Sequence, residues 1–96
     1  MKRYEIESLG DILRKAIDES DRASRYSEIE AINLWPRIVG RDLANRTLRP
    51  TVRQGVMTIK VPAAALRHEL NMMRTSLANA MNRELGKDVI SEIKFI

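Results

Sequence analysis

The stretch TLRPTVRQGVMTIKVP, residues 47–62, decides the fold, because within it the apolar residues change from a helical to an alternating period. Apolar and polar residues alternate on both sides of Gln54 and Gly55, which is typical of strands with one buried face. The stretch therefore predicts a β-hairpin with strands at residues 47–53 and 56–61. Pro50 cannot donate a hydrogen bond, so we expect the first strand to be irregular there or to lack a partner on that side.

Downstream of the hairpin, leucines and methionines recur at steps of three and four residues, which predicts a helix over residues 64–85. Gly86 follows as a left-handed cap. The last residues, VISEIKFI, are rich in β-branched side chains and predict a third strand over residues 89–95. Because a helix connects it to the hairpin, this strand should run parallel to the second and antiparallel to the first.

Upstream of the hairpin, the apolar period is helical. Leu9 to Ile17 follow helical spacing behind a capping-box pattern, so a helix is expected over residues 8–20. The polar run over residues 18–27 has no apolar period and is interpreted as a turn. A second helix is expected over residues 27–46, kinked at Pro36, with Trp35 still turned into the core.

Together these elements predict an α+β fold in the order α-α-β-β-α-β, as a single domain over residues 1–96. Its three-stranded mixed sheet would carry helices on one face, forming two layers. The opposite face would be left to water or to a ligand, and its expected members are Arg49, Thr51, Arg53, Thr58 and Lys60.

Composition excludes several classes of chemistry. The chain has no cysteine and one histidine, so disulfides, thiolate nucleophiles and cysteine-based zinc sites cannot form. The sequence contains no nucleophile motif, phosphate-cradling glycine loop or metal-ligand spacing. We therefore predict that the protein is not an enzyme and uses no cofactor, metal or small-molecule substrate. It also lacks a signal peptide and a long apolar span, which favours the cytoplasm and no membrane partner.

Basic residues supply the functional hypothesis. The net charge is +4, and residues 37–53 hold five arginines against a single acid, Asp42. Guanidinium groups bind phosphate well, so these side chains could contact a nucleic-acid backbone without reading sequence. The alternative is that they are solvated surface residues. With four aromatic residues, base stacking is not expected. The candidate nucleic-acid-binding residues are Arg37, Arg41, Arg46, Arg49, Arg53, Lys60, Arg67 and Arg74.

Three segments, LWPRIVGRDLANRTLRP, GVMTIKVPAAALRHEL and LGKDVISEIKF, resemble the bacterial DciA family in their order and spacing. The resemblance covers residues 9–95 and implies a KH-like domain that binds DNA and contacts the replicative DNA helicase, assisting its loading at initiation. This chain has no G-x-x-G motif, so the phosphate-clamping loop of KH domains is not carried over.

Two alternatives remain open at this point. The protein could be an interaction module in which the open sheet face or the edge of the third strand receives a helicase segment and DNA has no part. It could also be an RNA-binding KH-like protein, which would prefer structured RNA to DNA.

Overall fold

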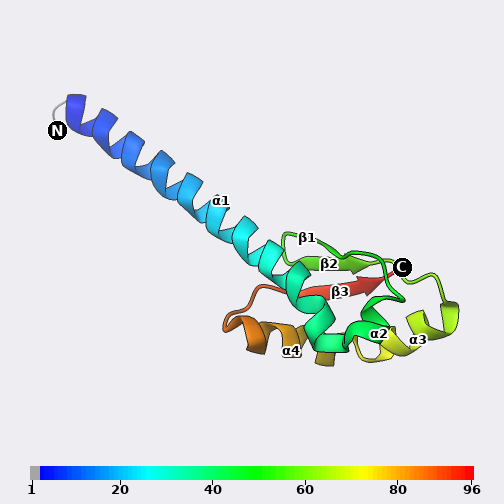
Figure 1. Ribbon diagram of the computed structural model, residues 1–96. Coiled ribbons are helices and arrows are strands. Elements are labelled where there is room, and N and C mark those ends of the chain that lie inside the picture. The colour runs from blue at the N-terminus through cyan, green and yellow to red at the C-terminus, as the bar shows by residue number, and fades with distance from the viewer. Residues whose placement is uncertain (1–2) are drawn as a thin grey trace.

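The computed structural model describes the backbone of residues 3–96 and the side chains from Leu9 onward. Its first element is a single long helix, α1, spanning Arg3–Val39. The N-terminal part of α1 projects away from the rest of the chain, and its C-terminal part packs against the sheet and the later helices (Figure 1). The molecule is therefore elongated, with extents of 65 × 22 × 19 Å.

The remaining elements form a small body at the C-terminal end of α1. They are α2 (Arg41–Ala44), β1 (Thr51–Arg53), β2 (Val56–Ile59), α3 (Ala64–Met72), α4 (Arg74–Leu85) and β3 (Glu92–Phe95). The sheet order is β1-β2-β3, with β1 antiparallel and β3 parallel to β2. The predicted α+β class, with its mixed three-stranded sheet and its order of elements, is confirmed.

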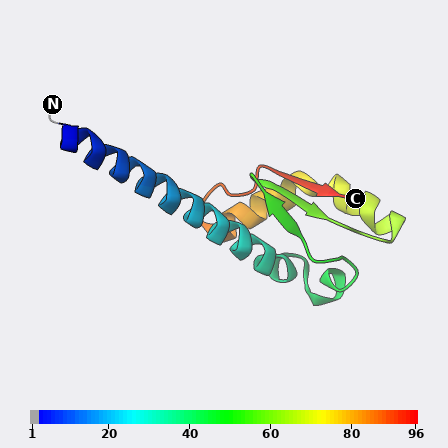
Figure 2. The same cartoon turned by 90° about the horizontal axis from the view of Figure 1, so that it is seen from above.

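The register gives the sheet one buried and one open face. Val52 pairs with Met57, which pairs with Ile93, and all three side chains are buried. The next row, Thr51 with Thr58, points the other way because successive side chains alternate across a strand. The helices lie against the buried face, as Figure 2 shows from above.

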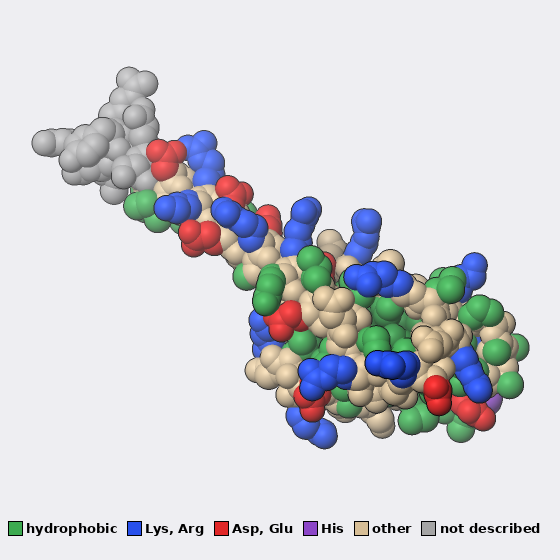
Figure 3. All heavy atoms as spheres, viewed as in Figure 1, with side chains coloured by type: hydrophobic (Ala, Val, Ile, Leu, Met, Phe, Trp, Pro, Cys, Tyr) green, Lys and Arg blue, Asp and Glu red, His purple; other side chains and the backbone are tan. Residues whose placement is uncertain are grey.

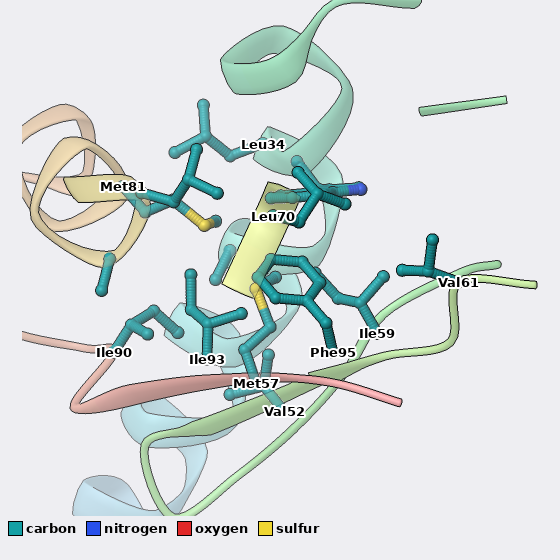
Figure 4. Packing of buried hydrophobic residues seen from close by; sticks show 14 residues of the cluster. Leu34, Val52, Met57, Ile59, Val61, Leu70, Met81, Ile90, Ile93 and Phe95 are labelled. Carbon is teal, nitrogen blue, oxygen red and sulfur yellow. The ribbon is translucent and has the colours of Figure 1, made fainter. Parts of the chain in front are cut away.

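The core lies between the sheet and the helices (Figure 4). Its largest fully buried side chains are Trp35, Met57, Ile59, Met81, Ile93 and Val61. They come from α1, β2, α4, β3 and the end of the hairpin, so their burial holds the helices against the sheet. Each such burial contributes roughly 1.5–3 kcal/mol relative to exposure in water.

The expected turn over residues 18–27 was wrong, because α1 is helical throughout this segment. The run contains neither glycine nor proline, so nothing in it breaks a helix. It lacks an apolar period because residues 18–26 are exposed on all sides. Ser27, expected as a cap, lies inside the helix and donates its hydroxyl hydrogen bond to the Ala23 carbonyl at 3.0 Å.

The helix that contains Pro36 ends earlier than the expected boundary at residue 46. Helix α1 continues through Pro36 to Val39, and the Gly40 N–H donates to the Pro36 carbonyl at 3.0 Å. The chain leaves the helical conformation at Gly40, where φ is 88° and ψ is 155°. The expected helix over residues 27–46 is therefore the end of α1 followed by the short α2.

The remaining strands and helices are shorter than predicted. Strand β1 begins at Thr51, directly after Pro50, which has no N–H for the ladder. The predicted helix over residues 64–85 is interrupted at Met73 and forms α3 and α4. The turn and the cap are confirmed, with positive φ at Gln54 and Gly55, as a type I′ turn requires, and at Gly86.

Strand β3 begins three residues later than predicted because the side chain of Asn82 holds the preceding loop. Its amide oxygen accepts hydrogen bonds from the N–H groups of Val89 and Ile90 at 3.0 and 2.8 Å. Its amide nitrogen donates to the Ile90 carbonyl at 2.7 Å. These bonds satisfy backbone groups that would otherwise need strand partners.

Candidate nucleic-acid interface

Trp35 fixes the end of α1 to the sheet. Its side chain is 1% exposed, and its ring lies 5.9 Å from that of Phe95 at a tilt of 44°. Its indole N–H donates to the Thr47 hydroxyl at 3.1 Å, and that hydroxyl donates to the Ala44 carbonyl at 2.9 Å. Trp35 therefore connects α1 to β3 and to Thr47 in the segment that follows α2. This anchoring leaves the neighbouring arginines at the surface.

Three of the predicted residues, Arg37, Arg41 and Arg46, lie in this region at the end of α1, in α2 and just after it. All three side chains are exposed. Among the residues whose side chains the structure describes, the one ion pair joins Arg14 to Asp11 on the projecting part of α1. The three guanidinium groups are thus available to an external anion.

A second group lies on the open face of the sheet. Arg53 is exposed at the end of β1, and its alternation with buried Val52 places it on the side of Thr51 and Thr58. Arg49 and Lys60 are also exposed and follow the same alternation beyond the strand ends. The topology therefore brings together three of the predicted residues that are separated along the chain.

Sequence reasoning missed a fourth basic residue on this face. Lys94 pairs with Thr58 in the parallel register of β2 and β3 and is exposed. Glu92, paired with Val56, places one acid on the same side. The alternation within VISEIKFI places Lys94 and Glu92 on the same face of the third strand, but only the register shows that they lie beside Thr58 and Val56.

The last two predicted residues do not join this face. Arg67 in α3 is partly buried, and its guanidinium donates to the Val61 carbonyl at 3.0 Å, so it ties α3 to the end of the hairpin. Arg74 is exposed at the start of α4. Since α3 and α4 belong to the helical layer, the eight predicted residues form separate groups rather than one surface.

The charge pattern differs between the two parts of the molecule. In the view of Figure 3, basic side chains spread over the body with few acidic ones between them, whereas both signs alternate along the projecting part of α1. A groove of about 1300 Å³ lies between α1 and β1, and its charges are also mixed, because Arg22, Arg25 and Arg53 line it together with Asp18, Asp21 and Glu28. An acidic ligand is therefore matched better by the open sheet face than by this groove.

The arrangement defines a class of protein: a small α+β domain with a basic open sheet face and a long projecting helix. Within the side chains that the structure describes, no cluster of histidine, aspartate and glutamate could hold a metal ion. In the same part of the chain, no helix has the length and apolar character needed to cross a membrane.

A family model described as "Dna[CI] antecedent, DciA" matches residues 8–95. The chain therefore belongs to the DciA family. The family is associated with the replicative helicase, is not a known class of enzymes, and implies a helicase-loader-related role in DNA replication. A comparison with curated protein sequences gives no match.

Proposed function

We propose that the protein is a non-enzymatic accessory of DNA replication in the cytoplasm. It binds the DNA backbone weakly and without sequence preference, and it contacts the replicative helicase to assist its loading. Family membership supports the replication role. The observation that carries the DNA contact is the open sheet face, where Arg49, Arg53, Lys60 and Lys94 surround two threonine hydroxyls and Glu92 is the acid of the β3 row.

The chemistry of this face suits phosphate. Arginine forks and hydroxyl donors form charge-assisted hydrogen bonds with phosphate oxygens, and such contacts hold a nucleic acid without reading its bases. Among the aromatic side chains that the structure describes, Trp35 and Phe95 are buried and Tyr26 lies on α1. The face therefore offers no platform on which bases could stack.

The exposed arginines near Trp35 supply a second contact region in this proposal. Arg37, Arg41 and Arg46 would extend the track of a bound backbone or meet an acidic surface of the helicase. The KH-like character implied by the family remains a prediction. Because the chain has no G-x-x-G loop, the proposed DNA contact depends on the arginine and lysine side chains.

The test is a salt titration of binding to mixed-sequence duplex DNA, followed by fluorescence anisotropy. We expect binding at about 50 mM salt that weakens steeply with added salt, since each phosphate contact contributes about −0.9 to the log–log slope on duplex. Replacing Arg49, Arg53 and Lys94 together by alanine should flatten this slope by roughly two to three and weaken binding at least about tenfold.

The matched control replaces Arg14, Lys15 and Arg22 by alanine, which removes the same charge from the projecting part of α1. This control variant should retain most of the salt dependence of DNA binding seen in the wild type. If both variants lost DNA affinity equally, only the net charge of the protein would matter. If the wild type did not bind DNA, or bound it with no dependence on salt, the proposed DNA contact would be wrong. Recovery of the helicase with the protein after nuclease treatment tests the helicase contact separately.

A further inference from the structure

The projecting part of α1 carries a stripe of large apolar side chains with no partner in the described chain. Leu9, Ile12, Leu13 and Ile17 are 49%, 61%, 57% and 61% exposed. Their spacing of three and four residues, with Ala16 between them, places them along one side of the helix. No other element approaches this part of α1 in Figure 1 or Figure 2.

This part of the helix lacks the packing that normally stabilises helices. Every side chain over residues 11–26 is exposed, and the segment includes serines and aspartates, which are weak helix formers. Most helical stability in proteins comes from packing an amphipathic face rather than from propensity. The apolar stripe is therefore the side of α1 that a partner would cover.

The same side of the helix changes from large to small residues towards the body. Ser20, Ala23, Ser24 and Ser27 continue the spacing of three and four, and they border an open hollow of about 510 Å³. The far side of the hollow is formed by the hairpin turn and the loop before β3, and it includes Gly55, Lys87, Asp88, Val89 and Ser91. The large side chains near the N-terminus of α1 and the hollow beside residues 20–27 thus lie on one face of the helix.

Charge narrows the choice of partner. Residues 9–26 hold four acidic and four basic side chains, so this part of α1 has no net charge. A helix that binds an anionic membrane is rich in lysine and arginine on its polar side, and a nucleic acid likewise selects basic residues. A helix with a matching apolar stripe and both signs of charge fits better, and α1 of another copy has both.

We propose that a second copy of this chain covers the stripe, forming an antiparallel pair of α1 helices about a two-fold axis near Ala16. In this arrangement Leu9 of each copy lies beside Ala23 of the other, and Ile12 lies beside Ser20. The large side chains near the N-terminus of each α1 then pack against the small residues at positions 20–27 of the other copy. A two-fold axis repeats every contact between the two copies, so each complementary pair of residues occurs twice in the dimer.

The mass of the intact chain in solution tests the pairing. In sedimentation equilibrium from about 1 to 300 μM, the apparent mass should rise from 11.0 kDa towards twice that value. Leu13→Gln with Ile17→Gln should raise the dissociation constant at least about 100-fold, because four large apolar side chains leave the dimer interface. A wild-type protein that stays monomeric over this range would overturn the proposal.

The matched control is Ile29→Gln, which makes the same chemical change at a residue of α1 that is 53% exposed and lies on the opposite side of the helix. It should dimerise like the wild type. If it weakened the dimer as much as the stripe variants, the interface would not be the one proposed.

Cysteine cross-linking tests the orientation, since the natural chain has no cysteine. Leu9→Cys and Ala23→Cys should form a mixed disulfide when the two variants are combined under oxidising conditions. A disulfide requires Cα atoms within about 7 Å, so neither variant should cross-link efficiently to itself in the antiparallel pair. Efficient self-linking of Ala23→Cys with no mixed product would indicate a parallel pair and overturn the proposed arrangement.

Discussion

At the scale of single residues, the link between Trp35 and Thr47 explains how a large polar aromatic can be fully buried. The indole N–H needs an acceptor once water is removed, and the Thr47 hydroxyl provides one at 3.1 Å. Thr47 is itself buried, and its hydroxyl donates a hydrogen bond to the Ala44 carbonyl. One hydroxyl therefore provides a partner for the indole N–H of α1 and for a backbone carbonyl of α2.

Thr47→Val keeps the shape of this residue but removes the hydroxyl. We expect it to lower the free energy of unfolding by about 1–3 kcal/mol, because the indole donor stays buried without a partner. Urea unfolding followed by tryptophan fluorescence measures the effect. The control, Thr51→Val, changes an exposed position of β1 and should shift stability by less than about 0.5 kcal/mol. Equal stability of Thr47→Val and the wild type would contradict the proposed role of the hydrogen bond.

At the scale of elements, α1 shows that a glycine, rather than the proline, ends the helix. Pro36 costs the helix one hydrogen bond but already has a helical φ, so the helix continues past it. Gly40 adopts φ 88° and ψ 155°, a region that side chains rarely enter, and there the chain turns into α2. The change in direction depends on this one backbone conformation.

Two glycine substitutions in and next to the same helix should have opposite effects. Gly40→Ala should destabilise the protein by about 1–3 kcal/mol through backbone strain alone, because an added Cβ would meet nothing within 4 Å. Gly10→Ala also has free space but lies within α1, so it should stabilise the helix by roughly 0.5–1 kcal/mol. Urea unfolding measures the loss of stability in Gly40→Ala, and far-UV circular dichroism of the native protein measures the gain of helix content in Gly10→Ala. A lower helix content in Gly10→Ala than in the wild type would contradict this explanation.

At the scale of the whole molecule, stability is distributed unevenly along α1. Its C-terminal part includes Ala31, Leu34 and Trp35, which belong to the buried core. Residues 11–26 have exposed side chains throughout. Regions with few buried apolar contacts open locally at low cost, so the two ends of one helix should behave as separate cooperative units.

Hydrogen exchange can measure this gradient. In dilute protein, amides over residues 11–24 should exchange faster than those over residues 31–39, because only the latter are held by the core. If α1 pairs with a second copy, protection over residues 11–24 should rise with protein concentration while that of the core stays constant. Uniform protection along α1 in dilute protein would contradict the gradient.

The sequence alone was sufficient for the features that depend on near neighbours. Alternation around Gln54 and Gly55 predicted the hairpin, and Gly86 predicted the helix cap, because both reflect local backbone preferences. Trp35 was correctly expected in the core from its place on an apolar stripe. The parallel pairing of β3 followed from chain order, since a helical connection returns the strand in the same direction.

Only the tertiary structure decided the features that depend on distant contacts or on solvent. The continuity of α1 over residues 18–27 has no apolar period to reveal it, because a helix surrounded by water needs none. Whether a basic side chain joins an open face or binds a nearby carbonyl depends on strand register and helix packing. That is why Lys94 belongs to the sheet face while Arg67 holds the backbone of Val61.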